Sequence, residues 1–159
     1  VDIRTIVEEI APFIEIEARA RRVPVRYRLL REPAPVDCDW VLIEQVISNL
    51  ARNGIEAMID TPIERRQLTL STHLTAAGSV NVSIEDRGHG LPRANPDRLF
   101  DAFFTTKKEG LGIGLSLCRS IVDSHGGHLW ATDGASGGAK FHFSLPLTTG
   151  EPVHDDPIR

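Results

Sequence analysis

A strand-like stretch that ends in an acidic residue and two glycines, Val80-Asn-Val-Ser-Ile-Glu85-Asp86-Arg-Gly88-His-Gly90, sets the architecture of the chain. Apolar and polar residues alternate from Val80 to Glu85, which predicts a strand with one buried face. Asp86 continues the buried register, where an unpaired carboxylate costs on the order of several kcal/mol. We therefore expect a backbone N–H, a water or a ligand to reach Asp86. Gly88 and Gly90 allow the backbone to turn tightly against a pocket, although a purely structural turn capped by Asp86 has the same local pattern.

Length and composition indicate one soluble globular domain. The chain has 159 residues, of which 41% are hydrophobic and 25% charged, and its net charge is −4. This balance gives no reason to expect nucleic acid or an acidic membrane surface as a partner. No apolar run is long enough to span a membrane, and no signal peptide is visible. We therefore expect this chain to lie in the cytoplasm, and the full-length protein could still be anchored in a membrane. In that reducing compartment Cys38 and Cys118 are expected to be buried free thiols.

Hydrophobic periodicity on either side of the central strand predicts helices and strands of ordinary length. Asp39 is expected to cap the helix over residues 40–59 through its side chain. The polar residues from Thr148 onward are expected to form a disordered tail. The expected elements are helices over residues 1–22, 40–59 and 114–126, strands over 25–29, 68–74, 80–86, 129–132 and 141–145, and an extended piece over 36–38 that pairs with the first strand.

The helix expected over residues 40–59 carries a polar stripe opposite its apolar face. Asn49 and Asn53 are one turn apart and project together, although asparagine is a poor helix former. Their carboxamides either bind something or belong to a solvated polar face. Gly54, in the helix interior, is unfavourable by about 1 kcal/mol relative to alanine and predicts close approach by another backbone. The stripe consists of Gln45, Asn49, Arg52, Asn53 and Glu56.

A glycine-rich loop, Gly110-Leu-Gly112-Ile-Gly114, opens the next helix and is a candidate site for phosphate. Free N–H groups and the positive end of the helix dipole meet at such a position. The spacing matches neither the P-loop nor the dinucleotide fingerprint. Lys107 and Lys108 precede the loop and could neutralise phosphate charge, while asparagine oxygens are ligands that Mg²⁺ accepts beside phosphates. With Asp86 as an acceptor for the exocyclic amine of adenine, these features indicate ATP with Mg²⁺.

Four motifs in this order resemble the ATP-binding domain of bacterial sensor histidine kinases, and the likeness runs to about Pro146. Within that family, the segment over residues 103–127 is similar to the nitrogen-regulation and oxygen-sensing kinases. The resemblance implies an α/β two-layer sandwich of the Bergerat type, in which a mixed sheet of about five strands packs on three helices. It implies a domain over residues 1–147 and a polar tail over 148–159. The motifs are Asn49-x-x-x-Asn53, Asp86-x-Gly88-x-Gly90, Phe100-x-x-Phe103-Phe104-Thr-Thr-Lys107 and Gly110-x-Gly112-x-Gly114.

The resemblance also implies a site for ATP and Mg²⁺ beneath a lid over about residues 95–111. Asn53 and Asn49 would hold the metal and, with Lys107, carry the catalytic role, while Asp86 would bind the adenine amine. The full set of nucleotide-binding residues that it implies is Asn49, Arg52, Asn53, Asp86, Gly88, Gly90, Phe100, Phe103, Thr105, Thr106, Lys107, Gly110, Leu111, Gly112, Ile113, Gly114 and Leu115.

Two departures from related proteins refine the expected activity. Related ATPases carry a glutamate one turn before the metal-binding asparagine, whereas this chain has Asn49, which favours phosphoryl transfer over hydrolysis. None of the six histidines lies in a helical hairpin of the kind that accepts the phosphoryl group. We therefore expect the catalytic part of a histidine kinase, whose acceptor histidine and contact with a response regulator lie on a dimerisation hairpin outside this sequence.

Taken alone, the chain is expected to be monomeric and not to phosphorylate itself. Two alternatives share its fold. The first is a pseudo-kinase that binds nucleotide, or nothing, and only docks partners. The second is a serine kinase of anti-sigma factors, which generally has the glutamate that position 49 lacks.

Overall fold

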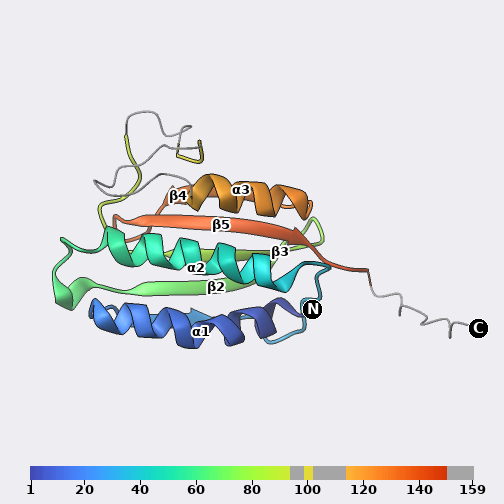
Figure 1. Cartoon of the computed structure of the whole chain (residues 1–159), viewed down its shortest axis with the longest axis horizontal. Helices are drawn as coiled ribbons and strands as arrows, with labels where there is room; N and C mark the ends of the chain where they lie inside the picture. Colours follow the sequence, from blue (N-terminus) through green and yellow to red (C-terminus); the bar gives the residue numbers. More distant parts are fainter. Residues whose placement is uncertain (94–98, 102–113, 150–159) are drawn as a thin grey trace, which may run out of the picture.

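The structure, a computed structural model, describes residues 1–93, 99–101 and 114–149. In these residues three helices lie side by side on one face of a five-stranded sheet (Figure 1). The central helix is α2 (Trp40–Ala57), and it lies between α1 (Ile3–Ala20) and α3 (Gly114–Ser124). The expected two-layer sandwich of three helices and about five strands is confirmed.

The sheet is mixed, with strand order β1-β2-β3-β5-β4. The first two strands of this order are parallel, and the other neighbours are antiparallel. Both predicted hairpins, β2 with β3 and β4 with β5, are confirmed. The strands are β1 (Val25–Arg28), β2 (Leu68–Leu74), β3 (Ser79–Glu85), β4 (His128–Asp133) and β5 (Ala139–Pro146), and a short 3-10 helix, η1 (Ile63–Arg65), precedes β2.

The core lies between the helices and the face of the sheet toward which the alternating apolar residues point. Burying these side chains supplies the main driving force for folding, at about 25 cal/mol per Å² of apolar surface removed from water. The apolar residues that alternate along the two central strands, β3 and β5, therefore point into this core, as the alternation predicts. The largest side chains that are fully buried include Ile3, Ile6, Ile43, Ile47, Leu50, Leu70, Ile84 and Phe143.

Aspartates begin the first two helices, as the sequence predicts for α2. The Asp39 carboxylate accepts hydrogen bonds from the N–H groups of Val41 and Leu42, at 3.1 and 3.3 Å. The Asp39 N–H in turn donates to Nε2 of His125, at 3.1 Å. These contacts satisfy free donors at the helix start and join the beginning of α2 to the end of α3.

The predicted pairing of residues 36–38 with the first strand is wrong. Residues 34–36 instead run between the N-terminus and the end of β5. The Val36 N–H donates to the Val1 carbonyl at 2.8 Å, and the Thr148 N–H donates to the Pro35 carbonyl at 2.9 Å. Both partners are distant in sequence, so the local pattern at 36–38 carries no sign of them.

The helix α3 buries a narrower face than its periodicity predicts. Cys118, Ile121 and Val122 are buried, but Leu117, whose side chain is also apolar, is 38% exposed. Cys118 and Cys38 are both free thiols, and only Cys118 is fully buried, since Cys38 is half-buried. Burial raises the pKa of the Cys118 thiol to about 11. In the part of the chain that the structure describes, no helix is long and apolar enough to cross a membrane.

Candidate functional site

Asp86 lies at the end of β3 and is the buried acidic residue around which the site is built. Its side chain is only 2% exposed. Oδ1 accepts hydrogen bonds from the N–H groups of Gly88 at 2.8 Å and Ala139 at 3.2 Å. Backbone donors therefore reach the carboxylate, as the sequence predicts. Burial raises the pKa of Asp86 above its ordinary value, and these two donors oppose the rise without cancelling it.

Glycines allow neighbouring segments to pack closely around Asp86, and Gly54 of α2 is one of them. A Cβ built at position 54 would lie 2.7 Å from Cδ1 of Leu68, 3.3 Å from Cβ of Asp86 and 3.6 Å from its Oδ2. The sequence correctly predicted close approach at this helical glycine. The approaching groups are side chains, however, and the expectation of a neighbouring backbone was wrong. The missing side chain lets α2 pack closely against β2 and the end of β3.

The loop after Asp86 is held against the end of α2. The His89 N–H donates to the Ala57 carbonyl at 3.3 Å, and the Thr61 hydroxyl donates to the Arg87 carbonyl at 2.9 Å. Gly88 has no room for a side chain, because a Cβ there would lie 2.6 Å from the carbonyl carbon of Ala57. Gly90 has a φ of +81°, in the region that glycine favours. The two glycines therefore have the turning and close-approach roles that the sequence predicts.

The polar stripe of α2 divides between its two neighbouring helices. Nδ2 of Asn49 donates to Sγ of Cys118 in α3 at 3.7 Å. Arg52 instead forms an exposed ion pair with Glu17 of α1, with Nη2 and Oε1 3.1 Å apart. Asn53 is half-buried next to Gly54. The structure thus brings Asn53, Gly54 and Asp86 to one end of α2, whereas Arg52 lies toward α1.

Phe100 packs where α3 meets the sheet. Its ring makes an edge-on contact with Phe141 of β5, with centroids 6.3 Å apart and planes at 88°. The guanidinium carbon of Arg119 lies 5.7 Å from the centre of the same ring. Both contacts favour a fixed position for Phe100. Gly114 and Leu115, predicted to contact nucleotide, form the first residues of α3, and Leu115 is half-buried against the core.

Most of the predicted lid lies outside the described residues, and so do eight of the predicted site residues. These residues are Phe103, Thr105, Thr106, Lys107, Gly110, Leu111, Gly112 and Ile113.

Sequence reasoning missed the loop between β4 and β5 as a wall of the site. A Cβ at Gly138 would lie 2.7 Å from Oδ1 of Asp86, and Ala139 supplies one of the two donors to that oxygen. The Ala135 N–H also donates to Oε2 of Glu85, at 3.0 Å. The Gly137-Gly138 pair was a signal for close approach, but nothing local linked it to Asp86.

Comparison with known proteins agrees with this geometry. Residues 38–149 match the family of histidine kinase-, DNA gyrase B-, and HSP90-like ATPases. The sensor protein TdiS of Thauera aromatica is 37% identical over 147 residues, which are 92% of this chain and 27% of TdiS. The sensor protein FixL of Bradyrhizobium diazoefficiens is 43% identical over 129 residues, 81% of this chain and 25% of FixL. The chain thus spans about a quarter of the length of these curated relatives.

A solved structure supports the same assignment at the level of one domain. The nucleotide-free catalytic domain of the histidine kinase ThkA superposes with a TM-score of 0.80 at 30% identity, covering 92% of this chain and 93% of that one. The chain therefore belongs to the family of histidine kinase-, DNA gyrase B-, and HSP90-like ATPases and has the fold of a sensor histidine kinase catalytic domain.

Proposed function

We propose that this domain binds ATP with Mg²⁺ and donates the γ-phosphoryl group to a histidine on a helical hairpin outside residues 1–159, in two-component signalling. The observation that carries the proposal is the buried Asp86 carboxylate, with two backbone donors on Oδ1. Oδ2 is then the oxygen that accepts from the exocyclic amine of adenine. A response regulator would receive the phosphoryl group through the same hairpin.

The residues around Asp86 fit a flat aromatic base. Positions 54, 88 and 138 carry no side chains, and a Cβ at position 54 would lie 3.6 Å from Oδ2. The amine of a base bound there would give up its hydrogen bond to water and donate to a buried carboxylate instead. A base with a carbonyl at the same place offers no donor, so the site would bind it much more weakly. The surroundings of Asp86 therefore support recognition of adenine rather than of phosphate.

The asparagines of α2 fit the phosphate and metal end. Asn49 directs Nδ2 to Cys118, so the oxygen of its carboxamide is the group free to serve as a ligand. Neutral amide oxygens suit Mg²⁺, which is usually held by few protein ligands together with phosphates and waters. When bound, the metal would neutralise charge on the phosphates. Asn49, Asn53 and Lys107 would orient the γ-phosphoryl group for transfer.

The same residues favour transfer to an acceptor over hydrolysis. A carboxamide at position 49 has no basic oxygen with which to remove a proton from water, so the site lacks the glutamate base of related ATPases. The domain's own contribution is therefore positioning and charge neutralisation. The base that takes the proton of the acceptor histidine lies with that histidine.

Phosphorylation of an added hairpin tests the proposal. Incubated alone with γ-labelled ATP, this chain should acquire no acid-labile label, because it lacks the acceptor. A longer protein that includes the upstream hairpin should acquire that label on the hairpin histidine and lose it when this histidine is replaced by glutamine. Failure to bind ATP at millimolar concentration would instead support the docking module, and phosphoserine on an added partner would support the serine kinase.

Replacing Asn53 with alanine should impair Mg²⁺ binding without impairing adenine binding. Adenosine affinity should stay within about twofold of wild type, whereas the gain in ATP affinity on adding Mg²⁺ should shrink, because only the second involves the metal. Gln45→Ala, an exposed change on the same helix, is the matched control. Calorimetric titration with adenosine and with ATP, each with and without Mg²⁺, measures both effects. Equal weakening of adenosine and ATP would contradict the assignment.

A further inference from the structure

The strand β1 leaves one row of main-chain groups at an open edge of the sheet. In the strand order of the described residues it lies at the end, and there it pairs only with β2. The Leu68 N–H donates to the Pro24 carbonyl at 2.9 Å, so main-chain groups of every second residue from Pro24 point toward β2. Because these directions alternate along a strand, the N–H and C=O groups of Val25 and Tyr27 point away from the sheet. An extended chain can pair with them.

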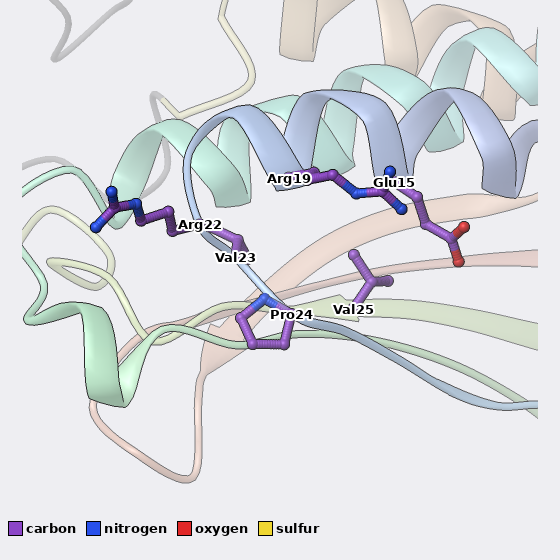
Figure 2. Close-up of a pocket in the computed structure, with 6 residues that line it drawn as sticks. All are labelled: Glu15, Arg19, Arg22, Val23, Pro24 and Val25. Carbon is purple, nitrogen blue, oxygen red and sulfur yellow. The ribbon is translucent and has the colours of Figure 1, made fainter.

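A groove of about 690 Å³ lies beside this edge, between α1 and β1. Figure 2 shows Glu15 and Arg19 on α1, across the groove from Pro24 and Val25. The hydroxyl of Tyr27, the next inward-facing residue of β1, is buried, and it faces Glu15 of α1. We call this surface the edge groove, and it is lined by Glu15, Arg19, Arg22, Val23, Pro24 and Val25.

The edge groove lies in a strongly basic part of an acidic chain. Residues 19–31 contain six arginines and no acidic residue, although the net charge of the chain is −4. Arg19 and Arg22 line the groove, while Arg26 and Arg28 are exposed on the other face of β1. An added strand would therefore meet guanidinium groups on both of its faces, although the Glu15 carboxylate also lines the groove. Such a surface attracts carboxylates and repels basic segments.

Arg22 stands where a glycine is usual. The Val23 N–H donates to the Ala18 carbonyl at 2.8 Å and the Arg22 N–H donates to the Arg19 carbonyl at 3.1 Å, which is the Schellman pattern at a helix end. Arg22 has a φ of +55°, the one non-glycine residue with positive φ among those described. A left-handed conformation is unfavourable for a residue with a side chain. Arg22 therefore lies at the rim of the groove in a backbone conformation that its side chain disfavours.

We propose that the edge groove binds an acidic polypeptide segment in extended conformation, which pairs with β1 as an additional strand. Main-chain groups of Val25 and Tyr27 would supply affinity, and the arginines would select acidic side chains, as in other cases of strand addition. Short strands, prolines and charges also protect open edges from aggregation. That protective role alone requires no binding, so the two explanations differ in a measurable way.

Fluorescence anisotropy with a labelled peptide of four Glu-Val repeats tests the proposal. The peptide should bind the whole chain saturably, a Gln-Val peptide of the same length should bind about tenfold or more weakly, and a Lys-Val peptide should not bind. A single-stranded DNA oligomer of equal charge serves as the comparison for a general polyanion surface.

Three variants examine the main chain and the charge separately. Val25→Pro removes an outward N–H without removing a hydrogen bond to β2. Val25→Ala loses the same side-chain contacts but keeps the N–H. The affinity of Val25→Pro for the Glu-Val peptide should therefore be about tenfold lower than that of Val25→Ala. Arg22→Gly should weaken binding while leaving the melting temperature equal to or above that of wild type. Arg93→Glu, which reverses the charge of an exposed arginine outside the groove, should leave peptide affinity nearly unchanged.

If Val25→Pro does not fold, a peptide with N-methylated alternate amides makes the same comparison on the wild-type chain. The labelled Glu-Val peptide is held at about 1 μM, and the protein is added up to a 100-fold excess over it. The proposal is overturned if no binding is seen at that excess. It is equally overturned if the DNA oligomer binds as tightly and neither Val25→Pro nor N-methylation changes peptide affinity. In the first case the arginines only protect the edge, and in the second they attract any polyanion.

Discussion

Replacing Gly138 with alanine should destabilise the folded domain by about 3 kcal/mol or more, enough to unfold much of a marginally stable protein. The added Cβ would lie 2.6 Å from the carbonyl carbon and 2.7 Å from Oδ1 of Asp86, and no real Cβ tolerates such contacts. Relief requires the start of β5 to move away from the end of β3. That movement would break the hydrogen bonds between Asp86 and Ala139, which join these strands beside the site.

The adjacent Gly137 supplies the matched control. Its φ is +89°, but a Cβ at this position would meet nothing within 4 Å. Gly137→Ala should therefore cost only the strain of a left-handed residue, about 1–2 kcal/mol. Urea unfolding of both variants followed by circular dichroism measures the difference. Equal destabilisation by the two substitutions would show that close approach to Asp86 is not what position 138 requires.

Local patterns predicted the elements of this fold well, because helices and hairpins are specified by residues close in sequence. Alternation at Val80–Glu85 and at Phe141–Leu145 placed the two central strands, and the Asp39 cap placed the start of α2. The same reasoning failed for residues 36–38, whose partners lie at Val1 and beyond β5. Pairings across so long a separation depend on strand order, which the local pattern does not contain.

The site was predicted in part for a similar reason. Asp86 was identified from its register, but its donor at Ala139 depends on β5 lying next to β3. The polar stripe of α2 was treated as one surface, whereas the helix lies between two others. Arg52 therefore meets Glu17 on one side, and Asn49 meets Cys118 on the other. Helical periodicity shows which residues share a face and leaves open what that face contacts.

Replacing Asp86 with asparagine should lower the affinity for adenosine, ADP and ATP to the same extent, by about ten- to a hundredfold. The variant keeps an oxygen for the N–H groups of Gly88 and Ala139, so the loop geometry should persist. The group at Oδ2 becomes an amide NH₂, which faces the adenine amine as donor against donor. Calorimetry with the three nucleotides measures the loss. Asp60→Asn, which removes the same charge at an exposed position, is the control.

The same substitution should also change how stability depends on pH. Because burial raises the pKa of Asp86, the folded state holds the proton more tightly than the unfolded state does. The stability that this group contributes is complete below its ordinary pKa of 3.8 and is lost as pH rises through the raised value in the folded state. Asparagine does not titrate, so the stability of Asp86→Asn relative to wild type should increase as the pH rises above 3.8 and through the raised pKa of Asp86 in the folded state.

Urea unfolding of the nucleotide-free proteins at several pH values above 3.8 tests this expectation. The loss of nucleotide affinity and the gain in stability have the same cause. A carboxylate kept ionised in an apolar pocket is a cost to the empty domain that a bound adenine amine would offset. The variant should therefore be relatively more stable without nucleotide at neutral pH and should lose that advantage when ATP saturates the wild type. If asparagine left adenosine affinity unchanged and gave no stability gain at higher pH, Asp86 would serve only to hold the loop beside β5.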